Sequence, residues 1–310
     1  MSAESPPPEP PPGAGQGDLR VLAPGMRVLL WIAGVLVVLA GTQLFVFTER
    51  TATYFAWTIN PPLTAAFLGA AYWSAAAFEW SAARARTWAD ARIAVPAVFV
   101  FTVLTLIATL VHLEKFHLGS SFGFGTQAVT WIWILIYAVV PLLMLVLWFR
   151  QSRAPGVDPP RTHRLPPWLR VVVAVQAVSL LAVGVGLFLA PYQTADLWPW
   201  ALTPLTSRAV GAWAFSLGVA AGHVLVEDDA RRVRPAAVAY LVFGVLELVS
   251  VLRYRDDGDW TSPAGLLYLL FLLSSLISGA CATWLGRTPA AVAFEPGPDP
   301  ARGNVTDPRR

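Results

Sequence analysis

The sequence predicts an all-α polytopic integral membrane protein, with eight transmembrane helices arranged as two tandem, parallel four-helix repeats. Hydrophobic residues make up 56% of the 310 residues and charged residues only 13%, whereas soluble proteins carry about 45–50% and about 25%. Several apolar runs reach about 20 residues, the length that an α-helix needs to cross a bilayer core. A sequence motif also occurs twice, which predicts the internal repeat.

The eight expected spans cover most of the chain between its two polar ends. In lipid each backbone N–H and C=O must be satisfied within its own segment, so runs of this length and uniform apolarity are typical of helices and not of barrel strands. The expected spans are residues 28–48, 61–83, 93–113, 126–149, 171–190, 201–226, 235–252 and 263–285.

The repeated motif is an aromatic residue followed by Pro-Leu-Thr and a glycine-containing run of small residues, in 57–73 and again in 200–213. An offset of about 143 positions relates the two copies, and it also relates residues well upstream of the motif. Since each half has an even number of spans, both halves enter the membrane from the same side. The residues related by this offset are Arg27, Gly41, Leu44, Phe45 and Trp57, which map onto Arg170, Gly184, Leu187, Phe188 and Trp200.

The two repeats divide the chain into five parts. We expect a disordered, proline-rich cytoplasmic tail in residues 1–27, because polyproline segments with little apolar content do not fold. No cleavable signal peptide is expected there. The first repeat covers 28–150, a cytoplasmic linker 151–169, the second repeat 170–286 and a second disordered cytoplasmic tail 287–310.

The basic residues predict that both termini are cytoplasmic. Of the 22 Lys and Arg residues, only five fall on the outer side in this arrangement, which agrees with the positive-inside rule. Tryptophans near both boundaries, such as Trp57 and Trp200 outside and Trp168 and Trp284 inside, are expected to form interfacial belts. The five outer basic residues are Arg50, Lys115, Arg208, Arg253 and Arg255.

The second and sixth spans are expected to lie centrally, because their small residues allow close helix packing, as in the pair Gly218-x-x-x-Gly222. The same small faces make a homo-oligomer conceivable. Asn60 and Thr203, just before the two Pro-Leu-Thr motifs, are natural helix N-caps.

Glu247 is the carboxylate nearest the middle of a predicted span. Such residues usually face the bundle interior and are paired. We expect a structural pair with Arg208, the arginine within span six, or with Arg253 near the outer surface. The alternative is a protonatable site on a transport pathway.

His112, Glu114 and His117 cluster at the outer end of the third span. Two imidazoles and a carboxylate can bind a transition metal, although the spacing of the two histidines separates their rings on an ideal helix. A solvated outer rim is the simpler interpretation. Glu79 lies close to an inner helix end and to Arg84 and Arg86, so we expect it to reach the interface.

Catalytic signatures are missing from the sequence: it contains no nucleophile elbow, HExxH, Walker or dinucleotide motif. The basic pI of 9.3 comes almost wholly from arginine, a usage typical of high-GC bacterial genomes, and does not indicate a nucleic-acid partner. No cofactor is expected, and the expected partner is the lipid bilayer of the cell (plasma or inner) membrane.

In their W-x-x-x-P-L-T motif, small-residue helices and R-P openings, residues 27–285 resemble a set of uncharacterised multi-span membrane proteins of actinobacterial type. The resemblance implies no activity.

Three functions remain open from the sequence. The first is a non-enzymatic small permease or lipid-handling protein, based on the duplication and on Glu247. The second is a membrane enzyme or metal-binding protein that acts at the outer face through His112, Glu114 and His117. The third is a scaffold subunit whose partner binds the proline-rich tail.

Overall fold

The computed structural model describes residues 18–287, and this part of the chain is all-helical, with 76% of it in helices and no strand. The predicted fold class is confirmed at this level. Eight helices are long, and short helical turns join several of them. The long helices are α1 (Pro24–Val46), α3 (Pro62–Ala83), α5 (Ala94–Val111), α6 (Phe124–Ser152), α7 (Pro167–Leu189), α9 (Pro204–Glu227), α10 (Arg234–Arg253) and α11 (Pro263–Leu285).

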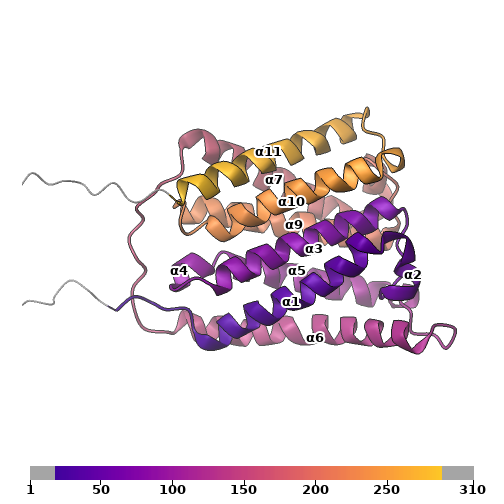
Figure 1. The fold of residues 1–310 in the computed structure, drawn as a ribbon, viewed down its shortest axis with the longest axis horizontal. Helices are drawn as coiled ribbons and strands as arrows, with labels where there is room; N and C mark the ends of the chain where they lie inside the picture. The colour runs from indigo at the N-terminus through magenta and orange to yellow at the C-terminus, as the bar shows by residue number, and fades with distance from the viewer. Residues whose placement is uncertain (1–17, 288–310) are drawn as a thin grey trace, which may run out of the picture.

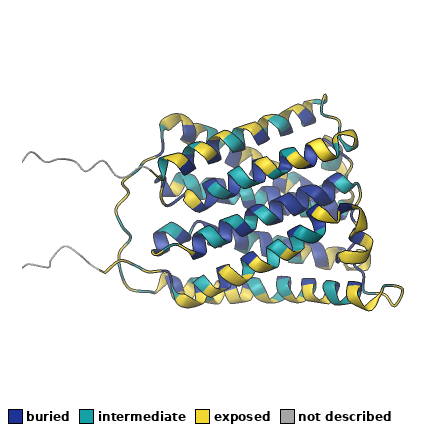
Figure 2. Cartoon of the chain, viewed as in Figure 1, coloured by how far each residue is buried: buried dark blue, intermediate teal, exposed yellow. Residues whose placement is uncertain are grey.

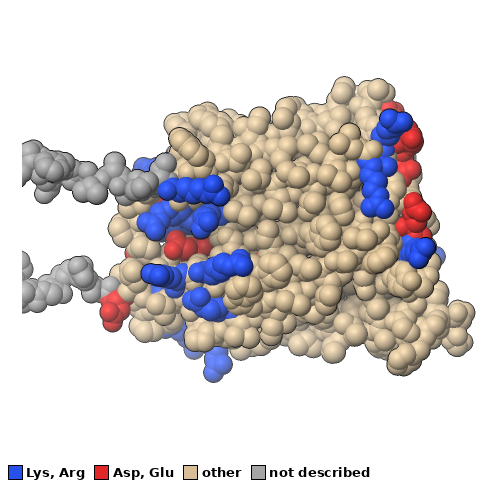
Figure 3. Space-filling model, viewed as in Figure 1, with Lys and Arg blue, Asp and Glu red and all other residues tan. Residues whose placement is uncertain are grey.

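Seven of these helices are long and apolar enough to cross a membrane, which indicates a multi-pass membrane protein. Helix α3 is the long helix that is not among the seven. It contains Glu79 together with Pro, Thr, Ser, Tyr and Trp residues, which lower its mean hydropathy. In Figure 3 the charged side chains lie at the two ends of the bundle, and a broad band without charges separates them.

The long helices pack as a bundle in which the two halves of the chain interlock (Figure 1). Within the first half, α1 packs along α3 and α5 packs along α6; within the second, α7 packs along α9 and α10 packs along α11. Between the halves, α3 packs on α10 and α5 packs on α9. The two halves therefore share one interior.

Helices α3, α9 and α10 form much of this interior. Most residues of α3 are buried, including Leu63, Phe67 and Tyr72, and α9 and α10 are more buried than the other apolar helices. Helix α6, in contrast, exposes large apolar side chains such as Leu142 along its outer face (Figure 2). The bundle thus keeps its small-residue helices inside and turns apolar faces outward, as a lipid environment requires.

Glycine permits the closest helix approaches in both halves. A Cβ on Gly69 of α3 would lie 2.5 Å from the backbone N of Phe45, and one on Gly184 of α7 would lie 2.5 Å from that of Phe215. Gly218 is similarly covered by Leu181, whereas Gly222 has nothing within 4 Å. Most of the small residues are therefore covered by the chain itself, so a second copy would have to use another face.

The helix starts agree with the sequence only in part. Thr203 caps α9 through a reciprocal hydrogen-bonded pair with Thr206, as its position predicts. Asn60 does not cap α3, because Pro61 occupies the N-cap position and makes no side-chain capping bond. The tryptophan belts also need correction: Trp57 and Trp200 are each only 3% exposed and belong to the core, whereas Trp168 and Trp284 are exposed.

The predicted tails lie largely outside the described residues, which exclude 1–17 and 288–310. Residues 18–23, which fall within the first predicted tail, lie before α1 at Pro24 and are partly hydrogen-bonded to the rest of the chain. Arg20 donates its N–H to the carbonyl of Val157 in the linker (2.9 Å) and accepts from Trp88 (2.9 Å). The linker 153–166 in turn contacts the α9–α10 turn, where Ala230 donates to the carbonyl of His163 (2.8 Å).

Candidate functional site

Glu247 is fully buried in α10, but it is not paired with an arginine. Its Oε2 accepts a hydrogen bond from the hydroxyl of Tyr268 in α11 (3.0 Å), and its Oε1 has no hydrogen-bond partner. Arg253 donates instead to the carbonyl of Phe45 (2.8 Å). Among the described residues no ion pair includes Glu247, so the expected structural pair with Arg208 or Arg253 is absent.

Arg208 contacts a different predicted site residue. Its Nη1 lies 2.7 Å from Nε2 of His112, and this hydrogen bond joins the first turns of α9 to the end of α5. Nδ1 of His112 lies 3.9 Å from Glu114, whose side chain is exposed. Burial, and then the positive charge of Arg208, lower the pKa of His112, while Glu114 acts in the opposite direction. His112 is therefore held neutral so that it can accept from Arg208.

His117 does not join this pair. Its Nδ1 lies 2.9 Å from the carbonyl of Phe55 and its Nε2 lies 3.0 Å from the hydroxyl of Thr58, so both ring nitrogens are already hydrogen-bonded. Burial lowers the pKa of His117, against a smaller raising effect of the bond to Phe55. Within residues 18–287, no group of three His, Cys, Asp or Glu side chains is arranged to hold a metal ion. The structure thus keeps His112 near Glu114 and places His117 in contacts of its own.

Glu79 is the carboxylate with the most unusual surroundings, and the expectation that it reaches the interface is wrong. It is only 2% exposed, its Oε2 is fully enclosed without a hydrogen-bond partner, and no ion pair involves it in the described part of the chain. Arg84, one turn further along, lies over the ring of Trp31 at 4.9 Å instead. The chain therefore buries this carboxyl group without compensating it.

Glu79 lines an apolar cavity of about 70 Å³, which we call the Glu79 cavity. Residues of α1, α3, α5, α6, α9 and α10 form its walls. Tyr137 of α6 is part of the lining, and its hydroxyl lies 2.6 Å from that of the buried Tyr72. The half-buried side chains of Leu36, Val37 and Val140 form the wall toward the outside of the bundle. Helices of both halves of the chain therefore line one cavity, and the unpaired carboxyl group of Glu79 is part of its wall.

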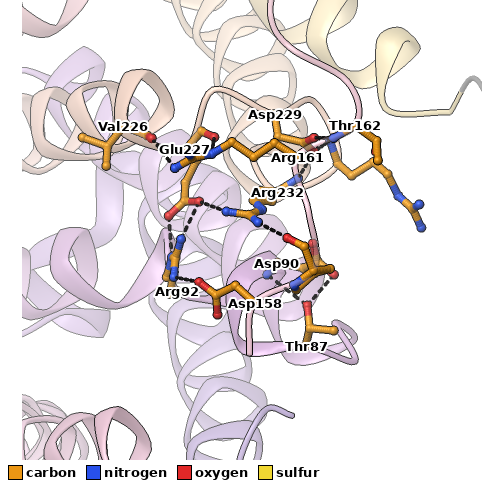
Figure 4. Close-up of polar contacts among 12 residues, drawn as sticks. Thr87, Asp90, Arg92, Asp158, Arg161, Thr162, Val226, Glu227, Asp229 and Arg232 are labelled. Atoms are coloured by element: carbon orange, nitrogen blue, oxygen red, sulfur yellow. Dashed lines mark hydrogen bonds and ion pairs between the residues drawn. The ribbon is translucent and has the colours of Figure 1, made fainter. Parts of the chain in front are cut away.

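A second polar feature is an ionic cluster at the end of the bundle where the linker lies (Figure 4). Arg92, between α4 (Trp88–Ala91) and α5, binds both oxygens of Glu227 at the end of α9, with Nη2 to Oε2 at 2.8 Å, and it also binds Asp158 of the linker. Arg232 donates to the same Glu227 (3.1 Å) and to the carbonyl of Pro159. One buried carboxylate therefore receives two guanidinium groups.

Backbone groups complete the ionic cluster. Asp229 accepts from the N–H of Thr162 (2.7 Å), of His163 (2.9 Å) and of Arg231 (3.0 Å). Burial by itself would raise the pKa of Asp229, but these bonds and one from Arg232 lower it. In the same way, hydrogen bonding to Glu227 raises the pKa of Arg92 despite its burial. Each charged side chain of the cluster has at least one partner, although Oδ1 of Asp158 has none, and the arrangement fits a structural clamp that fastens the linker to both halves.

Comparison with known proteins adds no identification: no protein-family model, no curated protein and no solved structure matches the chain. The resemblance noted from the sequence motifs therefore receives no support from these searches.

Sequence reasoning selected Glu247 and missed Glu79, although both carboxylates are buried. The signal that misled it was the pair of nearby arginines, Arg84 and Arg86, which are both exposed and lie beyond the end of α3. A usable signal was present in the helix itself, because Glu79 follows a run of alanines, a composition that suits a helix buried among other helices.

Proposed function

We propose that the protein is a small permease of the cell membrane and that the Glu79 cavity is its solute-binding site. The observation that supports this function is the unpaired carboxyl group of Glu79 on the wall of an interior cavity. A binding site of this kind, between helices of a bundle and with few polar groups, is where membrane transporters place substrate and coupling ions.

The physical argument concerns the charge of Glu79. An ionised carboxylate inside a membrane span costs about 2.5–3.5 kcal/mol on insertion scales, and more when nothing offsets it. Since no lysine or arginine of the described chain pairs with Glu79, its charge must be met by a bound proton or by a cation from outside. A buried carboxyl group whose charge must be met by a proton or an external cation is suited to binding and releasing that ion.

The proposal includes eight membrane crossings, with α3 as the second. Its 22 residues span about 33 Å at 1.5 Å per residue, enough for the hydrocarbon core. Its low hydropathy is no obstacle, because most of its side chains are buried against other helices and do not face lipid.

The proposal also includes the tandem repeat, which the packing supports. The pairs α1–α3 and α7–α9 correspond, as do α5–α6 and α10–α11. The second long helix of each half packs on the third long helix of the other half: α3 packs on α10, and α9 packs on α5. Matched residues make matched contacts: Gly69 approaches Phe45 as Gly211 approaches Phe188. Arg27 donates to the end of α3, at Ala83 and Ala85, and Arg170 contacts Asp228 at the end of α9.

The orientation follows from charge. We place the linker, the ionic cluster and the described ends of the chain on the cytoplasmic side, because most of the arginines lie at that end. Arg208, Arg253 and Arg255 then lie at the outer side. Accessibility of single cysteines introduced at Pro155 and at Gly258 checks this placement, with Pro155 expected to be reached only from the cytoplasm.

Reconstitution into proteoliposomes tests the function. Under an imposed potassium diffusion potential, wild-type protein should carry protons inward, as reported by an enclosed pH-sensitive dye, and Glu79→Gln should remove this flux. Glu114→Gln, at an exposed carboxylate, is the matched control and should leave the flux unchanged. Equal flux in wild type, Glu79→Gln and protein-free vesicles would disprove the proposed permease activity.

A further inference from the structure

We propose that the ligand of the Glu79 cavity is a small primary alkylammonium ion of about the size of methylammonium. This inference rests on the proposed function, because it names the solute class of the same site. Four properties of the cavity support it: its charge, the hydrogen-bonding character of its hydroxyl groups, its aromatic walls and its size.

The charge of the ligand follows from Glu79. Its carboxyl group is the acidic side chain that lines the cavity, and no basic side chain lines it. Arg84 and Arg86, the nearest arginines in sequence, are exposed. A ligand that enters this cavity therefore meets a carboxylate with no competing cation, which favours a positively charged ligand and disfavours an anion.

Three of the four hydroxyl groups that line the cavity, those of Ser74, Thr102 and Ser216, offer acceptors and not donors, and the fourth, that of Tyr137, is hydrogen-bonded to Tyr72. Ser74 and Thr102 each donate to a backbone carbonyl three residues earlier in their own helix (2.8 Å each). Ser216 of α9 donates to the carbonyl of Ala97 in α5 (2.7 Å). A hydroxyl has one proton and two lone pairs, so each of these oxygens can still accept but cannot donate. An ammonium group, which has donors only, complements such a lining.

Aromatic rings form part of the cavity wall, beside aliphatic side chains. Phe101, Tyr137 and Trp213 line it, and the rings of Phe101 and Trp213 lie against each other with centroids 4.0 Å apart. The face of an aromatic ring attracts a cation, and the attraction is stronger where water is excluded. These walls also accommodate an alkyl group, whereas a sodium ion would have to exchange its water ligands for the few oxygen atoms of the lining.

The size of the cavity limits the ligand. A volume of about 70 Å³ is about half of the 150 Å³ that holds benzene in an engineered protein cavity. It is sufficient for an ammonium group with a short alkyl chain. A tetramethylammonium ion is larger and has no N–H to donate to the hydroxyl oxygens, so it should be rejected on both grounds.

The test is binding of methylammonium chloride to the purified full-length chain in nanodiscs, measured by calorimetry and by tryptophan fluorescence. Sodium chloride at the same concentration serves as the ionic-strength control. We expect saturable 1:1 binding that is weakened at least tenfold in Glu79→Gln and is unchanged in Glu247→Gln, which alters a carboxylate outside the cavity. Ser216→Ala, which removes one acceptor, should weaken binding several-fold, and tetramethylammonium should not compete.

The inference is overturned if wild-type protein shows no saturable methylammonium binding, or if Glu79→Gln binds as tightly as wild type. If Glu79→Gln does not fold, Glu79→Asp replaces it, and we expect weakened binding because the shortened carboxylate withdraws from the cavity. Proton flux that depends on Glu79 in a protein that does not bind methylammonium would reject the ligand class alone. Methylammonium binding without flux would reject the permease activity and retain the site.

Discussion

Arg208 of α9 donates a hydrogen bond to Nε2 of His112 at the end of α5, over a distance of 2.7 Å. This contact joins the two halves of the chain at the end of the bundle opposite the ionic cluster. It also explains why Arg208 is not available to Glu247, because the guanidinium group is directed toward α5 and not toward α10.

The His112–Arg208 bond predicts a loss of stability in acid. Because the pKa of His112 is lowered on folding, the neutral form is favoured in the native state. Its contribution is complete above the unfolded value of about 6.5 and is lost as the pH falls from there through the folded pKa. Thermal unfolding in detergent should therefore decline below about pH 6.5, and His112→Gln, which keeps an acceptor for Arg208, should show a weaker decline. Identical pH profiles for the two proteins would contradict this assignment.

Substitutions at Glu247 and at its hydrogen-bond partner Tyr268 should have unequal effects on stability. Glu247→Gln keeps an oxygen that can accept from Tyr268, and it removes a buried acid, so we expect stability equal to or above that of wild type. Tyr268→Phe leaves the carboxyl group of Glu247 without its one hydrogen bond, so unfolding should become easier by about 1–3 kcal/mol. Urea or SDS unfolding in mixed micelles measures both, and a strongly destabilised Glu247→Gln would indicate an ion pair that the structure lacks.

The ionic cluster predicts strong coupling between Arg92 and Glu227. Removing Arg92 leaves Glu227 with Arg232 as its remaining guanidinium partner, so Arg92→Ala should cost about 1–3 kcal/mol of stability. Glu227→Gln should cost less in the Arg92→Ala background than in wild type, which a double-mutant cycle detects. Arg231→Ala, at an exposed arginine of the same turn, is the matched control and should change stability by less than about 0.5 kcal/mol. Additive effects of Arg92→Ala and Glu227→Gln would mean that these two residues are not energetically coupled and do not hold the linker together.

Two glycines of α9 predict opposite effects of the same substitution. A methyl group on Gly211 would lie 2.9 Å from the backbone N of Phe188, so Gly211→Ala should force α7 and α9 apart and cost about 1–3 kcal/mol. A methyl group on Gly222 meets nothing within 4 Å, so Gly222→Ala should stabilise the helix by about 0.5–1 kcal/mol. The measurement is again reversible unfolding in micelles. A stabilising Gly211→Ala would show that these two helices pack less closely than described.

The sequence by itself determined the helical architecture. Long apolar runs can satisfy their backbone hydrogen bonds only as helices, so the positions of α1, α5, α6, α7, α9, α10 and α11 follow from composition alone. Proline after a polar residue predicted the start of α9 and its cap at Thr203, because both signals are local. The absence of a side chain at Gly69 and Gly211 permits the close helix approach there but does not dictate it, because Gly222 has nothing within 4 Å.

Only the tertiary structure decided which polar groups meet. Glu247, Arg208, His112 and Glu79 each lie near several possible partners in sequence, and a few degrees of helix rotation choose among them. That rotation is set by side-chain packing over the whole bundle, where α3 fits against α10 and α5 fits against α9. The packing directs Arg208 to His112, Tyr268 to Glu247 and no basic side chain to Glu79, whose Oε2 is left without a hydrogen-bond partner.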